Sequence, residues 1–216
     1  MQKDEIITLL KEKKFDTIAN LAEKNTRGIF RLLIGITYDK SDILCWRAID
    51  VTGIIAGFVA KKNPEIIRNL AQRLLWMMRD ESGNNPSSAP EMLGEIVRNR
   101  PDEFADIAPV IASFHDEVML RAGVLRAILR IGEVRPDLID VSGEFILPFL
   151  QDEDPVVRAY ALLIAGTYAL KVTLPVIADL KNDHETVMLY SDGDFVTRRV
   201  GEIATKIFER FLEKEN

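Results

Sequence analysis

Apolar residues recur every three or four positions along most of the chain, which is the spacing of one face of an α-helix. The pattern predicts helices separated by short polar breaks, and the segment from about 42 to 62 is apolar on nearly every side. We therefore expect other elements to surround that helix. The longest polar interruption is 80–88. The predicted helices span approximately 4–13, 15–24, 27–38, 42–62, 64–79, 88–99, 116–132, 136–150, 155–170, 175–181 and 194–214, and a second apolar segment runs from 102 to 114.

Three series of residues mark the helix starts, and they share one period. Acidic residues precede first helices at spacings near 37–40 residues or twice that value: Asp42, Asp116, Asp154 and Asp194. Prolines begin second helices at similar spacings: Pro64, Pro101, Pro136 and Pro175. An arginine follows each acid by four or five positions: Arg47, Arg121, Arg158 and Arg198. A period near 40 residues with two helices per unit is typical of helical solenoids.

The pattern is clearest from Asp154 to Gly166. Asp154 is a predicted N-cap, and Pro155 is at the first helical position, where its missing N–H costs nothing. The segment Asp-Pro-Val-Val-Arg158, with Ala161 and Ala165 after it, resembles the HEAT repeat, specifically the short HEAT-like repeat also found in bilin lyase subunits. The resemblance covers about 40–210. It is partial at 116–132, weaker at 42–54 and 194–204, and lacks the arginine at 84–97.

This resemblance implies a right-handed curved stack in which the second helix of each pair lines the concave side. We predict an all-α, right-handed α-α superhelix (a HEAT-like solenoid) of about ten or eleven helices, without a sheet. Residues 1–216 are expected to form one domain, with capping helices at 1–40, repeats at 41–192 and a C-terminal capping helix at 193–216. The resemblance implies no activity, because such folds host scaffolds, adaptors and a few enzymes.

The charge of the chain bears on its partners. The net charge of −6 is uneven, because residues 101–216 carry 21 Asp and Glu against 12 Lys and Arg. An acidic half repels phosphate backbones, so we expect no nucleic-acid partner. The N-terminus is too polar for a signal peptide, and the most apolar run, 51–60, is too short to cross a membrane. We expect a cytoplasmic protein that does not bind membranes.

The sequence offers no constellation for catalysis. His115 and His184 lack the partners that a zinc site needs, and Cys45 lies in an apolar helix that makes a thiol inert. The helical glycines, such as Gly53 and Gly94, indicate close helix packing. Three arginines, Arg121, Arg126 and Arg130, are expected to pair with acids of neighbouring repeats. We therefore expect no catalytic residue, no metal site and no cofactor.

One tryptophan departs from the helical pattern. The apolar face of the helix at 64–79 contains Leu70, Leu74 and Met78, whereas Trp76 falls in the middle of the opposite, polar face. Either the loop at 80–88 covers Trp76, or Trp76 is exposed as an anchor for a partner. In the second case we expect a partner-binding site of Trp76, Gln72, Arg73, Arg79, Asp80, Glu81, Asn84 and Asn85.

The function predicted first is a non-enzymatic scaffold or adaptor that binds a protein or peptide on its concave face. The resemblance also suggests a bilin-lyase-like enzyme subunit, which would need an accessible thiol or acid to handle its chromophore. A HEAT-like DNA-repair glycosylase is the third alternative, and it would need a basic groove.

Overall fold

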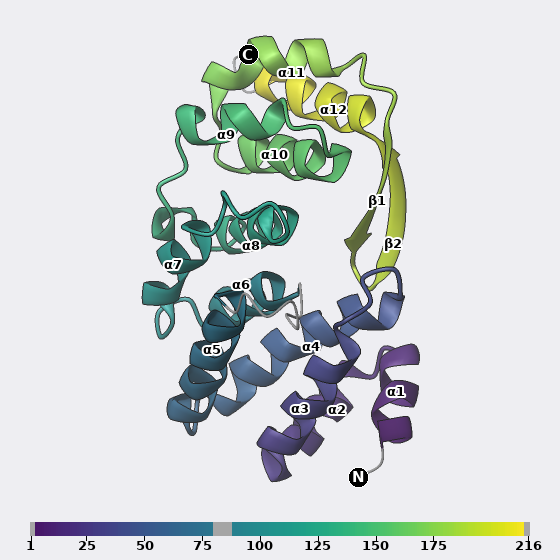
Figure 1. Ribbon diagram of the computed structural model, residues 1–216, viewed down its shortest axis with the longest axis vertical. Coiled ribbons are helices and arrows are strands. Elements are labelled where there is room, and N and C mark those ends of the chain that lie inside the picture. Colours follow the sequence, from purple (N-terminus) through teal and green to yellow (C-terminus); the bar gives the residue numbers. More distant parts are fainter. Residues whose placement is uncertain (1–2, 80–87, 214–216) are drawn as a thin grey trace. The chain divides into compact units, whose positions relative to one another are not determined.

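The computed structural model of the protein describes residues 3–79 and 88–213 (Figure 1). These residues form twelve α-helices, three short 3-10 helices and one two-stranded antiparallel sheet. The prediction of a mostly helical chain is confirmed, and the predicted absence of a sheet is wrong. The chain divides into two compact units, Met1–Ile131 and Gly132–Asn216. Among the described residues, no helix combines the length and apolar character that crossing a membrane requires.

The first unit is built around α4. Five helices pack on α4: α1, α2, α3, α5 and α6. The side chain of Asp42 accepts a hydrogen bond from the backbone N–H of Leu44, 2.9 Å away, and this caps the helix as predicted. The elements of the unit are α1 (Lys3–Lys11), α2 (Phe15–Lys24), α3 (Thr26–Ile36), α4 (Ile43–Val59), α5 (Pro64–Met78), α6 (Ala89–Asn99), η1 (Ala105–Ile107), α7 (Ala108–Ala112) and α8 (Arg121–Gly132).

Two glycines allow the backbones of these helices to approach closely. A Cβ on Gly53 of α4 would lie 2.7 Å from the carbonyl oxygen of Glu95 in α6. A Cβ on Gly94 of α6 would lie 2.7 Å from the Cβ of Ala127 in α8. Real Cβ atoms do not approach their neighbours this closely, so these positions need glycine. The predicted role of helical glycines in close packing is confirmed at both sites.

The contact of α6 with α4 and α8 also buries charged side chains. The Glu95 side chain is only 2% exposed and accepts from Nε of Arg130 at 2.7 Å. The guanidinium of Arg126, itself 3% exposed, lies 3.4 Å from the same carboxylate and 5.1 Å from the ring centroid of Trp46. A buried carboxylate needs such partners, because an unpaired charge in a protein interior costs several kcal/mol. The predicted pairing of Arg126 and Arg130 with an acid of another helix is confirmed.

The start of α8 differs from the prediction. We expected a helix from Asp116, but residues 116–120 lie largely in turns and the helix begins at Arg121. Asp116 is therefore not its N-cap. Arg121 instead donates to the backbone carbonyl oxygens of His115 and Asp116, at 3.3 and 3.5 Å.

The second unit is built around α10, which packs against α9, α12 and β1. Asp154 accepts from the backbone N–H of Val156 at 2.8 Å, and Pro155 lies in the first turn, so both predictions for this helix start are confirmed. The elements are η2 (Pro136–Leu138), α9 (Gly143–Leu150), α10 (Pro155–Thr167), η3 (Lys171–Thr173), α11 (Leu174–Leu180), β1 (Thr186–Ser191), β2 (Asp194–Arg199) and α12 (Val200–Glu213).

The sheet occupies a segment where a helix start was predicted. Strands β1 and β2 form an antiparallel hairpin in register Ser191↔Asp194, and Asp192 and Gly193 in its loop have φ values of 53° and 88°. Two consecutive residues with positive φ make the tight turn for which Asp-Gly is a preferred sequence. Asp194 is thus a strand residue rather than an N-cap, Arg198 is not on a helix, and the last helix begins at Val200 instead of 194.

Two of the four marker prolines begin second helices. Pro64 and Pro175 lie in the first turns of α5 and α11, as predicted. Pro136 begins only the short η2, and Pro101 lies in a turn before η1. The predicted helix starts at Pro64 and Pro175 are thus confirmed. Those at Pro101 and Pro136 are wrong, because the chain forms a turn and a short 3-10 helix there.

We expect Gly94→Ala to destabilise the protein by about 1–3 kcal/mol, because the new methyl group must displace α8 in a packed interior. Gly35→Ala in α3 is the matched control. No atom lies within 4 Å of a Cβ at that position. Removing a helical glycine there should therefore stabilise the protein by about 0.5–1 kcal/mol. Urea denaturation of both variants measures the difference, and equal effects would contradict the close approach of α6 and α8.

Candidate functional site

Trp76 lies on the exposed face of α5. Asn63 and Pro64 start this helix, and its buried face includes Leu70, Leu74 and Met78. The Trp76 side chain is 65% exposed. The loop that would cover Trp76 in the other interpretation, 80–88, lies outside the described residues except for Ser88. Tryptophan is one of the residue types enriched at protein interfaces.

The polar residues predicted around Trp76 on the helix are exposed with it. Gln72, Arg73 and Arg79 all face solvent. The guanidinium of Arg79 lies 6.0 Å from the ring centroid of Phe114, so the C-terminal end of α5 is close to the segment after α7. The other four residues predicted for this site, Asp80, Glu81, Asn84 and Asn85, lie outside the described residues.

Two further apolar side chains follow Phe114 in the chain. Val118 is 73% exposed and Met119 is 85% exposed, in the turns between α7 and α8. The sequence reasoning missed them because it assigned 116–132 to one helix. Their local sequence gives no signal of exposure, because adjacent apolar residues can both lie on the buried face of a helix, as Leu33 and Ile34 of α3 do. We call the exposed face of α5 with Trp76, Gln72, Arg73 and Arg79 the Trp76 surface.

The Trp76 surface has the composition of a protein-binding site. It offers one large aromatic ring, one amide and two guanidinium groups. Aromatic residues, methionine and arginine are the residue types enriched in interfaces. A ligand segment with apolar side chains and carboxylates would complement it, since arginine binds carboxylates through paired hydrogen bonds.

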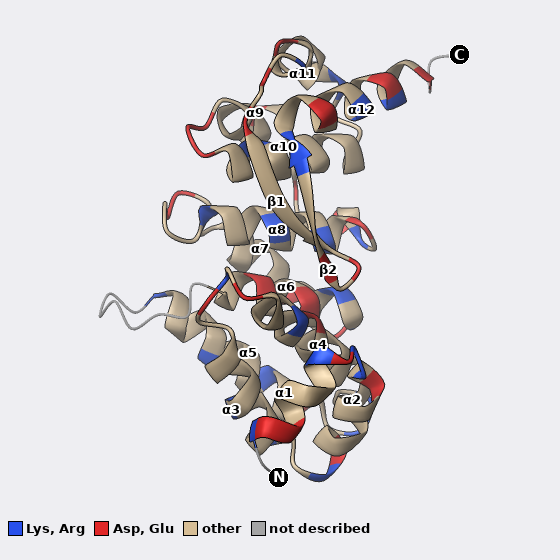
Figure 2. Cartoon of the chain, turned by 90° about the vertical axis from the view of Figure 1, so that its right-hand side faces the viewer, with Lys and Arg blue, Asp and Glu red and all other residues tan. Residues whose placement is uncertain are grey.

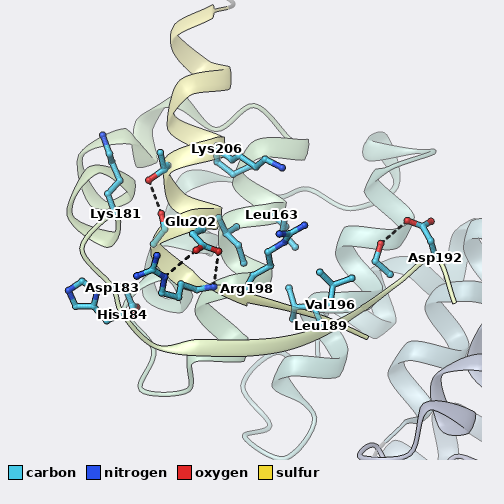
Figure 3. A pocket seen from close by; sticks show the side chains of 16 residues that line it. Leu163, Lys181, Asp183, His184, Leu189, Asp192, Val196, Arg198, Glu202 and Lys206 are labelled. Carbon is cyan, nitrogen blue, oxygen red and sulfur yellow. Dashed lines mark hydrogen bonds and ion pairs between the residues drawn. The ribbon is translucent and has the colours of Figure 1, made fainter. Parts of the chain in front are cut away.

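A second feature, in the second unit, is a partly open cavity of about 770 Å³ between the hairpin and α12 (Figure 3). Its apolar lining comes from α10, β1, β2 and α12. In Figure 2 the end of β2 is basic and α12 has an acidic stretch near its start. The sequence reasoning missed this cavity entirely, because it assigned the hairpin segment in part to a helix. We call it the hairpin cavity.

Most carboxylates of the hairpin cavity are already paired. Glu202 accepts hydrogen bonds from the backbone N–H of Arg199 at 3.3 Å and from its Nε at 3.1 Å, and these bonds lower the pKa of Glu202. Asp183 lies 2.8 Å from the guanidinium of Arg158. Lys181 is 4.6 Å from the ring centroid of Phe208, an arrangement that stabilises its charge.

Cys45 and His115, two of the residues considered for catalysis, each contact a neighbouring polar group. Cys45 is buried, with Sγ 3.7 Å from Oγ of Ser88, and burial raises the pKa of its thiol to about 11. Nδ1 of His115 lies 2.9 Å from the carbonyl oxygen of Ala112, at the end of α7. Within the described residues, no three His, Cys, Asp or Glu side chains cluster in a way that could hold a metal ion.

The two tryptophans of the chain allow a direct test of exposure. We expect Trp76→Ala to change the free energy of unfolding by less than about 0.5 kcal/mol, as for other exposed positions. Trp46→Ala should cost about 2 kcal/mol or more. Trp46 is half-buried, donates from Nε1 to the carbonyl oxygen of Lys40 at 2.9 Å and stacks on Arg126. A large loss of stability in Trp76→Ala would return this residue to the core.

The thiol of Cys45 should be inert at neutral pH. We expect a disulfide reagent such as DTNB to label it at pH 8 only after unfolding, because the folded thiol stays protonated. The pKa of the thiol is 9.0 in the unfolded chain and about 11 in the folded protein. Between these two pH values the unfolded thiol ionises while the folded one stays protonated. The free energy of unfolding should therefore fall as pH rises through this window, and Cys45→Ala should reduce that fall. Rapid labelling of the native protein would contradict the buried placement.

Comparison with known proteins adds one relative. No family model matches the chain. The chain is similar to a protein of Archaeoglobus fulgidus described as an uncharacterized protein, with 27% identity over 183 residues. The match covers 82% of this chain and 94% of that protein, so the similarity extends along most of both chains and carries no activity with it.

Proposed function

We propose that this chain is a non-enzymatic interaction module of HEAT-like helical repeats, and that the Trp76 surface binds a protein partner. The observation that carries the proposal is the 65% exposure of Trp76 between exposed Arg73 and Arg79. A large aromatic residue within a polar fringe is the usual composition of an interface hot spot.

The repeat part of the proposal is supported by a shared local geometry. Arg158 donates to the carbonyl oxygens of Asp152 and Glu153, at 2.7 and 3.0 Å. Arg121 does the same to the residues six and five positions before it. Each arginine thus ties the start of its helix to the turn before it. This common bonding supports the HEAT-like pattern, and the right-handed solenoid is part of the proposal.

The position of α5 in its pair agrees with this function. The pair is α4 and α5, and α5 is the second helix. In HEAT-like repeats the second helices line the concave surface on which partners bind. Trp76, Gln72 and Arg73 are on the solvent face of α5, while Leu70 and Leu74 hold its other face in the core. The surface is therefore rigidly mounted, which reduces the entropy lost on binding.

The chemistry of the partner follows from the charges. Arg73 and Arg79 are both exposed on α5, so we propose a protein segment with an apolar side chain for Trp76 and carboxylates for the arginines. Association with such a segment should weaken with added salt, because exposed ion pairs are screened.

The enzyme alternatives have less support. A bilin-lyase-like reaction through a thiol would need an accessible cysteine, and Cys45 is buried with a raised pKa. A DNA-repair glycosylase would need a basic groove, and residues 101–216 are strongly acidic in composition.

The proposal is tested by comparative capture from an extract of the native host. The immobilised wild-type chain, Trp76→Ala and Tyr38→Ala are used in parallel, because Tyr38 is a second exposed aromatic residue of the same unit, at 56%. We expect a protein that the wild type and Tyr38→Ala retain and that Trp76→Ala binds at least tenfold more weakly, the loss typical of a hot spot. Equal retention by all three chains would refute the Trp76 surface as the binding site.

A further inference from the structure

The hairpin cavity has the size of a small-molecule site and is partly open to solvent. Its volume of about 770 Å³ falls within the roughly 300–1,000 Å³ of known ligand pockets. It lies inside the second unit, between β1, β2, α10 and α12, all of which contribute lining residues. An isolated two-stranded hairpin is only marginally stable in water. We therefore expect the hairpin to pack against the helices without leaving a space between them. Here a cavity remains beneath the hairpin.

The lining of the cavity is mainly apolar. Leu163 of α10, Leu189 of β1 and Val196 of β2 are each half-buried, and Ile203 and Ile207 of α12 complete this side of the cavity. Figure 3 shows Leu189 and Val196 next to each other on the paired strands. A ligand with an aliphatic body would remove the remaining apolar area of these side chains from water, which is favourable.

Two cations beside this apolar lining are not neutralised by an ion pair. Among the described residues, no hydrogen bond or ion pair is made by the side chain of Arg198 on β2 or by that of Lys206 on α12. Figure 3 shows the two on the same side of α12.

The acidic residues of the lining do not supply the missing counter-ion. Glu202 is bonded to Arg199, and Asp183 is bonded to Arg158. Asp192 accepts from the hydroxyl of Ser191 at 3.0 Å, in the turn at the far end of the hairpin (Figure 3). The lining as a whole has an excess of one positive charge, because it contains four cationic side chains, Lys181, Arg198, Arg199 and Lys206, and three carboxylates, Asp183, Asp192 and Glu202.

We propose that the hairpin cavity binds a free aliphatic carboxylate, with its chain on Leu163, Leu189 and Val196 and its carboxylate paired with Arg198 and Lys206. The single negative charge of a carboxylate matches the excess positive charge of the lining. Its unbranched hydrocarbon chain can contact the apolar side chains that α10, β1, β2 and α12 contribute. This site is separate from the Trp76 surface, so the inference does not rest on the proposed function.

Isothermal titration with dodecanoate below its micelle concentration tests the proposal. We expect one saturable site in the wild type and in Arg31→Gln, a control that removes an exposed arginine from the other unit. The double variant Arg198→Gln/Lys206→Gln should bind at least tenfold more weakly. Acetate, which lacks the chain, and dodecylammonium, which reverses the charge, should not bind.

A second variant tests the apolar half of the site independently. Val196→Trp should fill the cavity while it keeps both cations, and it suits a strand position. We expect this variant to lose dodecanoate binding and to keep the circular dichroism melting curve of the wild type. The proposal is overturned if the wild type does not bind dodecanoate, if dodecylammonium binds equally well, or if both sets of variants bind like the wild type.

Discussion

The first unit depends on the close approach of α6 to its neighbours α4 and α8. Gly53 and Gly94 allow the backbones to meet, and the same contact places Glu95 in the interior. The buried carboxylate then requires Arg126 and Arg130, so backbone packing and charge pairing specify the same arrangement. Helix α5 packs against both α4 and α6. The orientation of its solvent face, and with it the Trp76 surface, therefore follows from this contact.

Capping residues and helical periodicity predicted the helices correctly where no other local sequence signal favoured a different structure. Asp42 and Asp154 cap their helices, and the first three helices lie within two residues of their predicted bounds, because capping and helical periodicity are local properties. The prediction was wrong where the repeat period of about 40 residues was extended to segments whose own residues favour turns or a hairpin. Asp192-Gly193 is a strong hairpin signal, and it determines the structure of 186–199. Asp116 likewise begins a series of turns, and the helix starts five residues later.

The candidate site could be predicted only where it lies on one helix. The helical wheel placed Trp76, Gln72 and Arg73 together on the polar face of α5, because neighbouring positions on one helix are set by its geometry, but it left open whether the loop at 80–88 covers Trp76. The exposure of Val118 and Met119 could not be predicted, since it depends on where α8 begins. The hairpin cavity needs four elements from separate parts of the chain, and no periodicity in the sequence indicates that they enclose a space.

Site-specific photo-crosslinking tests whether a protein docks on the exposed face of α5. A benzoylphenylalanine replaces Gln72, one turn before Trp76, or Gln151, an exposed glutamine of the second unit that serves as control. After irradiation in the native host, we expect a covalent adduct with one defined protein from position 72 and none with that protein from position 151. Absence of an adduct at 72, or the same adduct from both positions, would contradict docking on this face.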